Sequence, residues 1–212
     1  AELDKATIGG DLTMKEGSNG TVTAEGGSIG GAITNAGAVS LEGTDVTGSI
    51  GMNGKLTMTE GASAASVTGA TSAELDDATI TGELKVTGGS IEATDATIGS
   101  ITGTASSTKL EGVTVADANG TAGSIAVKGS VEMIGSTAGT ITGATSVTLS
   151  DKVVDAADGS QIVTDTKVDG SITMSDALTM GGAEVTGTIT GATSAELDKA
   201  TIGGDLTMKE GS

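Results

Sequence analysis

The chain contains no Cys, His, Pro, Arg, Phe, Tyr or Trp among its 212 residues. The absence of Cys excludes disulfides, and the absence of both Cys and His excludes the usual zinc sites. Nucleophilic Ser–His and Cys–His catalysis is excluded for the same reason. Without aromatic rings the core has to be built from small and β-branched side chains. No apolar run reaches about 18 residues, so no transmembrane helix is expected.

Glycine and acid dominate what is present. There are 36 Gly, 28 acidic residues against 10 Lys, and a net charge of −18. This charge disfavours nucleic acid and anionic membranes, both of which attract basic patches. Disorder is one interpretation of such a composition. A regular scatter of Ile, Val, Leu and Met in alternating positions argues against it, because solvating linkers lack that pattern.

One long segment occurs twice. Residues 1–18 read AELDKATIGGDLTMKEGS, and residues 195–212 repeat this sequence without a change. A match of this length is expected by chance at about 20 to the power −18 with equal residue usage, so it marks a tandem repeat. We therefore expect a single continuous domain over residues 1–212, made of one unit at 1–194 and the start of the next copy at 195–212.

A weaker repeat divides the unit. Similar passages begin at leucines that are 34 to 48 residues apart: Leu3, Leu41, Leu75, Leu110, Leu149 and Leu197. Each passage has room for about four short strands separated by Gly, Ser, Asn or Asp turns. We expect one passage to form two coils of about 17 to 20 residues each.

Alternation after these leucines predicts strands with one apolar face. The pattern apolar–x–Gly–x–apolar–x–apolar recurs, and its Gly indicates either a corner where only hydrogen fits or a close approach of two walls. The residues expected to point inward are Leu3, Ile8, Leu12, Met14, Val46, Ile50, Met52, Leu75, Ile80, Leu84, Val86, Leu149 and Leu197. A second alternating element, ITGATS or a close variant, precedes three of the leucines, with Val67, Gly69, Thr71 and Ala73 expected on one face.

These patterns predict an all-β fold: an elongated parallel β-solenoid of about ten to twelve short coils, with a narrow aliphatic core and no helices of note. The alternative is an antiparallel sandwich with hairpins at the Asn-Gly pairs 19–20, 53–54 and 119–120. Repeats of uniform phase favour the solenoid. Residues 151–170 are acidic and alternate weakly, so we expect a loop or irregular coil that protrudes from the stack.

Candidate sites are few. Asp155, Asp158 and Asp169 offer the carboxylates that Ca²⁺ prefers, but no known calcium-loop spacing accompanies them, and solvated loop acids are the alternative. The sequence predicts that no cofactor is required, and calcium is a possible ligand. Asn19 and Asn119 begin N-x-Thr acceptor sequences for glycosylation, although Asn-Gly is already explained as a turn.

Two further functions can be weighed from the residues. Enzymes built on β-helices combine carboxylates with basic or aromatic sugar platforms, and here Arg and aromatic residues are missing, so we expect no enzyme. Thr-x-Thr sequences raise the possibility of an ice-ordering surface, but their spacing is uneven.

The ITGATS runs at 141–146 and 189–194, the Thr-rich alternation and the long identical unit resemble the repeat regions of giant bacterial surface proteins. These include β-solenoid adhesins and the shafts of extracellular filaments or sheaths. Bactofilin-type polymers share the Gly/Ile/Val alternation but not the long identical repeat.

The resemblance implies a structural role at the cell surface, outside the cell. The chain would be a repeat segment of a fibre that stiffens by stacking coils and units. Alternatively, it would be a subunit that assembles end to end or laterally into a filament, tube or sheath. The expected partner is another unit or copy of the same chain, with no nucleic acid, membrane insertion or small-molecule substrate.

Overall fold

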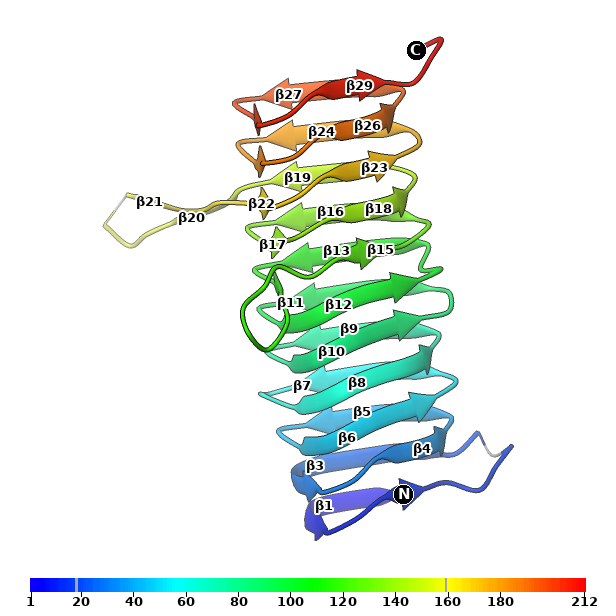
Figure 1. Ribbon diagram of the computed structural model, residues 1–212. Helices are drawn as coiled ribbons and strands as arrows, with labels where there is room; N and C mark the ends of the chain where they lie inside the picture. The colour runs from blue at the N-terminus through cyan, green and yellow to red at the C-terminus, as the bar shows by residue number, and fades with distance from the viewer. Residues whose placement is uncertain (18, 159) are drawn as a thin grey trace.

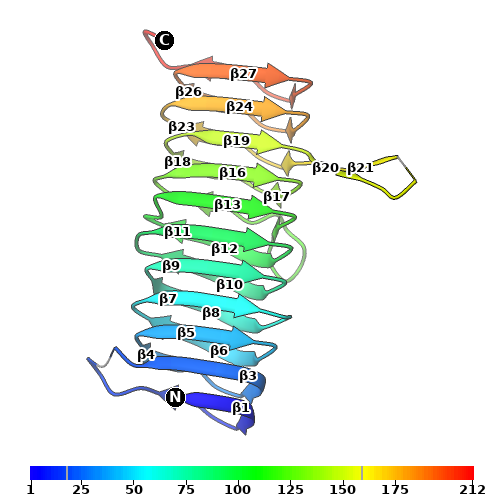
Figure 2. The same cartoon turned by 180° about the vertical axis from the view of Figure 1, so that it is seen from behind.

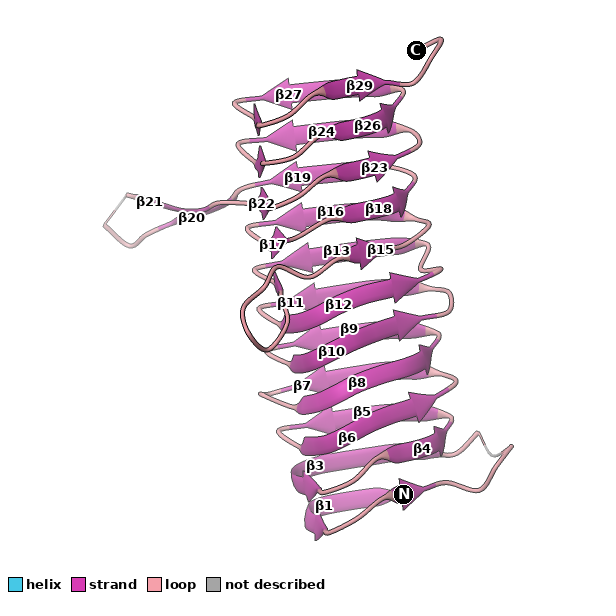
Figure 3. Ribbon diagram, viewed as in Figure 1, coloured by secondary structure: helices cyan, strands magenta, loops and turns pink. Residues whose placement is uncertain are grey.

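The structure, a computed structural model, describes residues 1–17, 19–158 and 160–212. In these residues it is all-β, and 27 of the strands form one continuous sheet that winds into a parallel solenoid (Figures 1 and 3). The N-terminus lies at one end of the rod and the C-terminus at the other. The parallel β-solenoid prediction is confirmed, and the antiparallel sandwich is wrong because every strand pairing within this sheet is parallel.

Each coil contributes to three parallel ladders, which we call faces A, B and C. Face A contains the first parts of β1 (Glu2–Ile8) and β3 (Thr21–Ile29), then β5 (Ala38–Glu42), β7 (Lys55–Thr59), β9 (Ser72–Asp76), β11 (Ser90–Thr94), β13 (Ser107–Glu111), β16 (Ser130–Ile134), β19 (Val147–Ser150), β24 (Ala177–Gly181) and β27 (Ser194–Asp198). Face B takes the ends of β1 and β3, the first residues of four long strands, and then β14 (Thr114–Val115), β17 (Thr137–Ala138), β22 (Lys167–Val168), β25 (Glu184–Val185) and β28 (Thr201–Ile202).

The four long strands bend from face B onto face C. They are β6 (Asp45–Met52), β8 (Ser63–Ala70), β10 (Thr79–Val86) and β12 (Thr97–Gly103). Face C is completed by β2 (Leu12–Thr13), β4 (Ile33–Ala36), β15 (Ile125–Ala126), β18 (Ile141–Ala144), β23 (Ile172–Met174), β26 (Ile189–Ala192) and β29 (Leu206–Met208). Seen from behind, the face A strands stack as a regular ladder along the rod (Figure 2).

The strand register defines eleven rungs. On face A one inward position passes from rung to rung through Leu3, Ala24, Leu41, Met58, Leu75, Ala93, Leu110, Met133, Leu149, Met180 and Leu197. The commonest spacing between neighbours is 17 residues. Every passage between the leucines that mark the weaker repeat therefore contains two coils, as the sequence pattern indicates.

The core is a stack of such inward files. Eight of the expected inward residues are buried: Val46, Ile50, Met52, Leu75, Ile80, Leu84, Val86 and Leu149. The four in the first rung, Leu3, Ile8, Leu12 and Met14, are partly buried and pack against this core. Leu197 differs from the expectation, because its side chain is 45% exposed. It continues the file above Met180, but no further rung among the described residues covers it.

Large and small side chains alternate in one part of the core. Along one file of face C, Ala36 pairs with Met52, Ala144 with Met174, and Ala192 with Met208. A methionine on one rung fills the space that an alanine leaves on the next, so the file reaches a dense packing without any aromatic ring.

The ITGATS element departs from simple alternation. Gly69 adopts φ +83°, and the register of β10 against β8 shifts at this residue. Gly143 and Gly191 repeat the same conformation. The shift is a β-bulge that turns the next residue inward, so Ala70 is buried while Thr71 is exposed. The expectation that Gly69 and Thr71 share the inward face is therefore wrong.

Three insertions interrupt the 17-residue spacing without interrupting the ladders. Among the described residues they are 14–17 with 19–20, 116–122, and a hairpin formed by β20 (Lys152–Asp155) and β21 (Gln161–Thr164). The protrusion expected at 151–170 is present, but an antiparallel hairpin takes the place of the expected loop. The Asn53-Gly54 turn joins two solenoid strands, β6 and β7, and not an antiparallel hairpin.

The corner between faces B and C brings neighbouring backbones into close contact. Gly31 donates its N–H to the carbonyl of Gly10, and Gly48 donates to Gly31, both at 3.1 Å. A Cβ atom at Gly48 would lie 2.7 Å from the carbonyl carbon and oxygen of Gly31. The reading of this glycine as a corner where only hydrogen fits is therefore right, and the close approach is between successive rungs, not between two walls of the core.

We predict that Gly48→Ala lowers the free energy of unfolding by about 1–3 kcal/mol, because backbone atoms have to move to admit the methyl group. Gly181→Ala is the matched control, since nothing lies within 4 Å of a Cβ at that position. Its effect should stay within about 0.5 kcal/mol. Chemical denaturation followed by circular dichroism measures both, and equal effects would show that the corner is not crowded.

One buried side chain breaks an apolar file. Thr108 lies between Ile91 and Val131 on face A and is 1% exposed, and its hydroxyl has no hydrogen-bond partner among the described residues. Thr108→Val keeps the shape and removes the unpaired hydroxyl, so we expect a gain of about 1–2 kcal/mol in unfolding free energy. Thr142→Val, at an exposed position of β18, is the control and should change little. Loss of stability in Thr108→Val would contradict this explanation.

Candidate functional surfaces

The two ends of the rod are formed by the same sequence. Residues 1–14 make the N-terminal rung, β1 and β2, and residues 195–208 complete the C-terminal rung, β27 to β29. The N-terminal rung pairs upward with β3 and β4. The C-terminal rung pairs downward with β24, β25 and β26. Each end rung therefore has one edge that no described residue of this chain covers.

The duplicated residues occupy equivalent places at the two ends. Leu3 and Leu197 lie in the same file of face A. Ile8 and Ile202 begin and end the inward file of face B. Leu12 and Leu206 do so on face C. Partial burial of the residues at both ends follows from the missing neighbour, because each file stops there.

The hairpin β20–β21 is the second distinctive surface. It projects sideways from the rod, and its cross-strand pairs are apolar at the centre (Figure 1). Four large apolar side chains are between 48% and 58% exposed: Val153, Val154, Ile162 and Val163. The expectation of a loop overlooked a signal in the sequence, where two β-branched pairs flank an Ala/Asp/Gly turn in a hairpin pattern.

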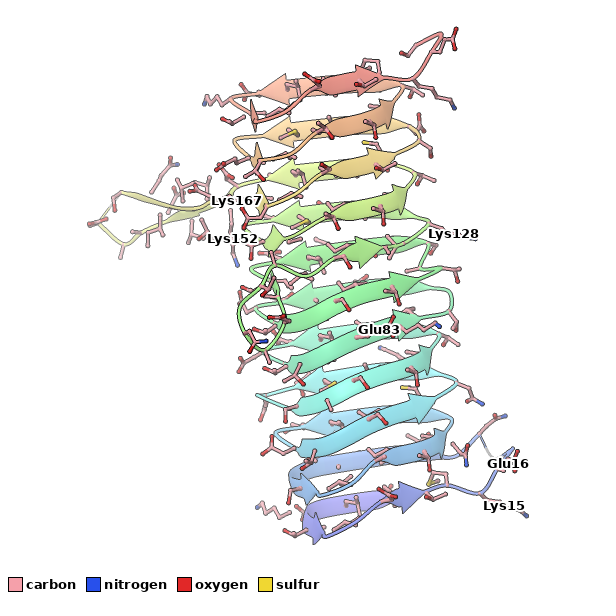
Figure 4. All side chains as sticks on the ribbon, in the orientation of Figure 1. Lys15, Glu16, Glu83, Lys128, Lys152 and Lys167 are labelled. Atoms are coloured by element: carbon pink, nitrogen blue, oxygen red, sulfur yellow. The ribbon has the colours of Figure 1, made fainter. Side chains whose placement is uncertain are left out.

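Polar contacts fix the base of this hairpin to the rod. The Nζ atom of Lys152 lies 3.3 Å from Glu111 Oε1 and 3.8 Å from Asp95 Oδ1, on two earlier rungs. Asp151 Oδ1 accepts the N–H of Thr166 at 2.8 Å. Figure 4 shows Lys152 and Lys167 where the hairpin leaves the solenoid. The hairpin therefore leaves the rod from an anchored base.

The three candidate calcium ligands each have a different local partner. Asp155 Oδ1 accepts from Gln161 at 3.2 Å. Asp158 Oδ1 accepts from both the hydroxyl and the N–H of Ser160, which holds the pKa of that carboxyl below its ordinary value. Asp169 pairs with Lys167 at 2.9 Å, and the hydrogen bond to Asp169 raises the pKa of the lysine.

The three aspartates are not brought together as one set of ligands. Within residues 1–17, 19–158 and 160–212, no group of three or more Asp or Glu side chains is placed to hold a metal ion. Calcium at these aspartates stays a prediction of the sequence.

Thermal unfolding in millimolar calcium and in EDTA tests whether calcium binds these aspartates. We expect equal Tm values, because the side chains are already engaged; a higher Tm with calcium that Asp158→Asn abolishes would establish the site.

The loop at residues 116–122 is held by one carboxylate. Asp117 Oδ1 accepts the N–H groups of Thr121 and Asn119, both at 2.9 Å, and these bonds lower the pKa of Asp117. Since the folded pKa is lowered, the contribution of these hydrogen bonds to stability is present at neutral pH and is lost as the pH falls through the lowered pKa.

The two candidate glycosylation sites, Asn119 and Asn19, are both exposed. Glycosylation at either one stays untested.

Outward threonines align on face C better than their sequence spacing indicates. Thr142, Thr173, Thr190 and Thr207 lie on four consecutive rungs. Ala126 interrupts the file below Thr142, and Lys85 stands in it between Thr68 and Thr102. Although the Thr-x-Thr spacing in the sequence is uneven, outward threonines form an aligned file over these four rungs, and ice ordering stays an untested possibility of the sequence.

No protein-family model matches the chain, and no curated protein or solved structure is detectably similar to it. The described residues include no helix long and apolar enough to cross a membrane.

Proposed function

We propose that the chain is a structural segment of an extracellular fibre, a stiff rod built by stacking coils and tandem units. One observation carries the proposal: the same sequence, at residues 1–14 and 195–208, forms the first and the last rung, in the same inward files. The upper edge of the C-terminal rung therefore presents the same backbone groups and inward side chains that the N-terminal rung presents to β3. A following unit continues the solenoid without a change of geometry.

The physical properties of the rungs suit this role. Neighbouring rungs are hydrogen-bonded along three ladders. The three ladders together resist bending and stretching of the rod. Ten rungs at about 4.8 Å give a rise of about 48 Å for each 194-residue unit. Few large side chains are needed, and the net charge of −18 keeps separate rods apart in solution.

The alternative is a subunit that assembles end to end or laterally into a filament, tube or sheath. The mass of the denatured native polypeptide separates the two: a chain many units long supports the covalent fibre, and a short chain supports the assembly. In both forms the partner is another unit or copy of this chain. We place the protein at the cell surface because of its compositional resemblance to surface repeats.

We propose no catalytic role. The chain lacks Arg, His, Cys and aromatic residues. The exposed hairpin favours contact with another macromolecule over chemistry, because apolar side chains in water are stabilised when a partner covers them. A calcium-stabilised adhesin and an ice-binding surface are lesser candidates.

The periodic rod makes a prediction about length. A chain with residues 1–194 placed ahead of the present 212 residues should form a rod about 48 Å longer, since it adds ten rungs. Small-angle X-ray scattering or electron microscopy measures the increment. Its cross-section should stay the same as that of the 212-residue chain. A second unit that folds back beside the first would widen the particle and contradict the proposal.

A further inference from the structure

We propose that the β20–β21 hairpin is a lateral link between rods, and that its partner is the same hairpin on a second copy of this chain. The inference rests on the proposed fibre function, because the link joins fibres side by side. Hairpins of neighbouring rods pack face to face, and each covers apolar side chains that otherwise meet water. The acidic rods themselves do not have to touch.

The hairpin holds most of the large apolar side chains that the fold leaves in water. Within residues 1–17, 19–158 and 160–212, six such side chains are exposed: Val153, Val154, Ile162, Val163, Leu197 and Met208. The last two belong to the C-terminal rung, where the inward files stop. The described sides of the rod therefore offer no large exposed apolar side chain to a neighbour. On a second copy, the surface that matches a hairpin is another hairpin.

Both faces of the hairpin are apolar at their centre. Val153 pairs with Val163 across the two strands, and Val154 pairs with Ile162. Because neighbouring residues of a strand point to opposite faces, each face carries one of these two pairs. A partner with a single apolar surface covers one face and leaves the other in water. A second hairpin fits better, because a stack of hairpins from neighbouring copies covers both faces of each member.

The base of the hairpin directs its two faces up and down the rod. Lys152 and Thr164 share the lower face, and a Cβ atom at Gly135, on the rung below, would lie 2.5 Å and 3.4 Å from their Cβ atoms. On the upper side, a Cβ atom at Gly182, on the rung above, would meet Oδ2 of Asp151. A hairpin that enters from a neighbouring rod can therefore lie on either face without displacing a rung.

Charge separates the rods more than it separates the hairpins. Residues 152–164 contain one Lys and two Asp, which is a net charge of −1 out of the −18 of the chain. The hairpin projects sideways (Figure 1), and a strand of four residues such as β20 is about 13 Å long. Repulsion between exposed charges is screened over about 8 Å at physiological ionic strength. Two hairpins can therefore meet while their rods stay beyond the range of strong repulsion.

A single hairpin contact is small, so the link depends on repetition. Four half-exposed side chains are far fewer than the roughly 20–30 residues that each partner gives to a standard stable interface. In a fibre, the corner between faces A and B recurs in every unit, so a hairpin projects about every 48 Å. Two parallel rods of equal period bring many such contacts into reach, and the first contact favours the next. A second copy is the partner that has this period.

Substitution of the four apolar side chains by Thr tests the link. Thr keeps the β-branched shape and the strand preference at exposed positions, so the fold should persist in the variant with Val153→Thr, Val154→Thr, Ile162→Thr and Val163→Thr. We expect the two-unit chain to self-associate at least about tenfold more tightly than the 212-residue chain, and the four substitutions, made in both units, to remove this difference. Sedimentation equilibrium measures the affinities. Contacts through the rod ends are the same in parent and variant, so they cancel.

Cross-linking tests the partner and leaves the apolar side chains in place. Gln161→Cys puts a single thiol on the hairpin, since the chain has no cysteine of its own. A bifunctional thiol reagent with a reach of about 10 Å spans two stacked strand layers. We expect at least about tenfold more covalent dimer than from Thr142→Cys, at an exposed position of β18, because contact raises the effective concentration of the two thiols.

Two results overturn the proposal. One is an unchanged affinity in the Thr variant when its circular dichroism and Tm match those of the parent chain. The other is an equal yield of covalent dimer from Gln161→Cys and Thr142→Cys. A hairpin that serves a different protein, and not a second copy, gives both results.

The two proposals fail separately. The length of the two-unit chain tests the fibre, and it is measured on the Thr variant, in which hairpins cannot draw two rods together. If that chain has the expected length but parent and variant associate equally, the lateral link is wrong and the periodic rod stands. If that chain folds back on itself, the fibre proposal fails whatever the cross-linking shows.

Discussion

Every rung of this solenoid depends on the rung beside it. The N–H and C=O groups of a strand point along the rod, so a coil satisfies them only through its neighbours. The inward side chains depend on the same contact, because a single coil is too thin to enclose them. This constraint explains the side-chain choices: Gly48 where backbones nearly touch, and Ala36 paired with the larger Met52 in one inward file. It also makes the two ends the least satisfied parts of the molecule.

The same constraint decides where the chain tolerates insertions. The insertion before β3, the loop at 116–122 and the β20–β21 hairpin all leave between strands, where their described residues break no ladder. The hairpin differs from the other two insertions, because it carries exposed apolar residues on an antiparallel pair of strands that is too small to be stable alone in water. Its anchored base, with Lys152 near Glu111, holds it at one defined point of each unit.

The periodic part of the structure could be predicted from the sequence, and part of its local detail could not. The repeated leucines predicted the two coils in each passage, since a file of inward residues has to recur at the coil length. The bulge at Gly69 escaped prediction, because strict alternation cannot tell a left-handed glycine from an extended one. The exposure of Leu197 escaped for another reason: inward direction is local, whereas burial depends on the next rung.

Identity of the two end rungs has a consequence that composition alone does not carry. The duplicated sequence has to fit β24 to β26 on its lower edge and β3 and β4 on its upper edge. Those two neighbours differ, so the same sequence fits two different surfaces. Its acidic residues meet unlike neighbours in the two contacts, since Asp4 pairs with Glu25 and Asp198 with Gly181. What the two contacts share is the inward file through Leu3 and Leu197, so the apolar file and the ladder, more than the outward charges, decide whether a rung fits its neighbour.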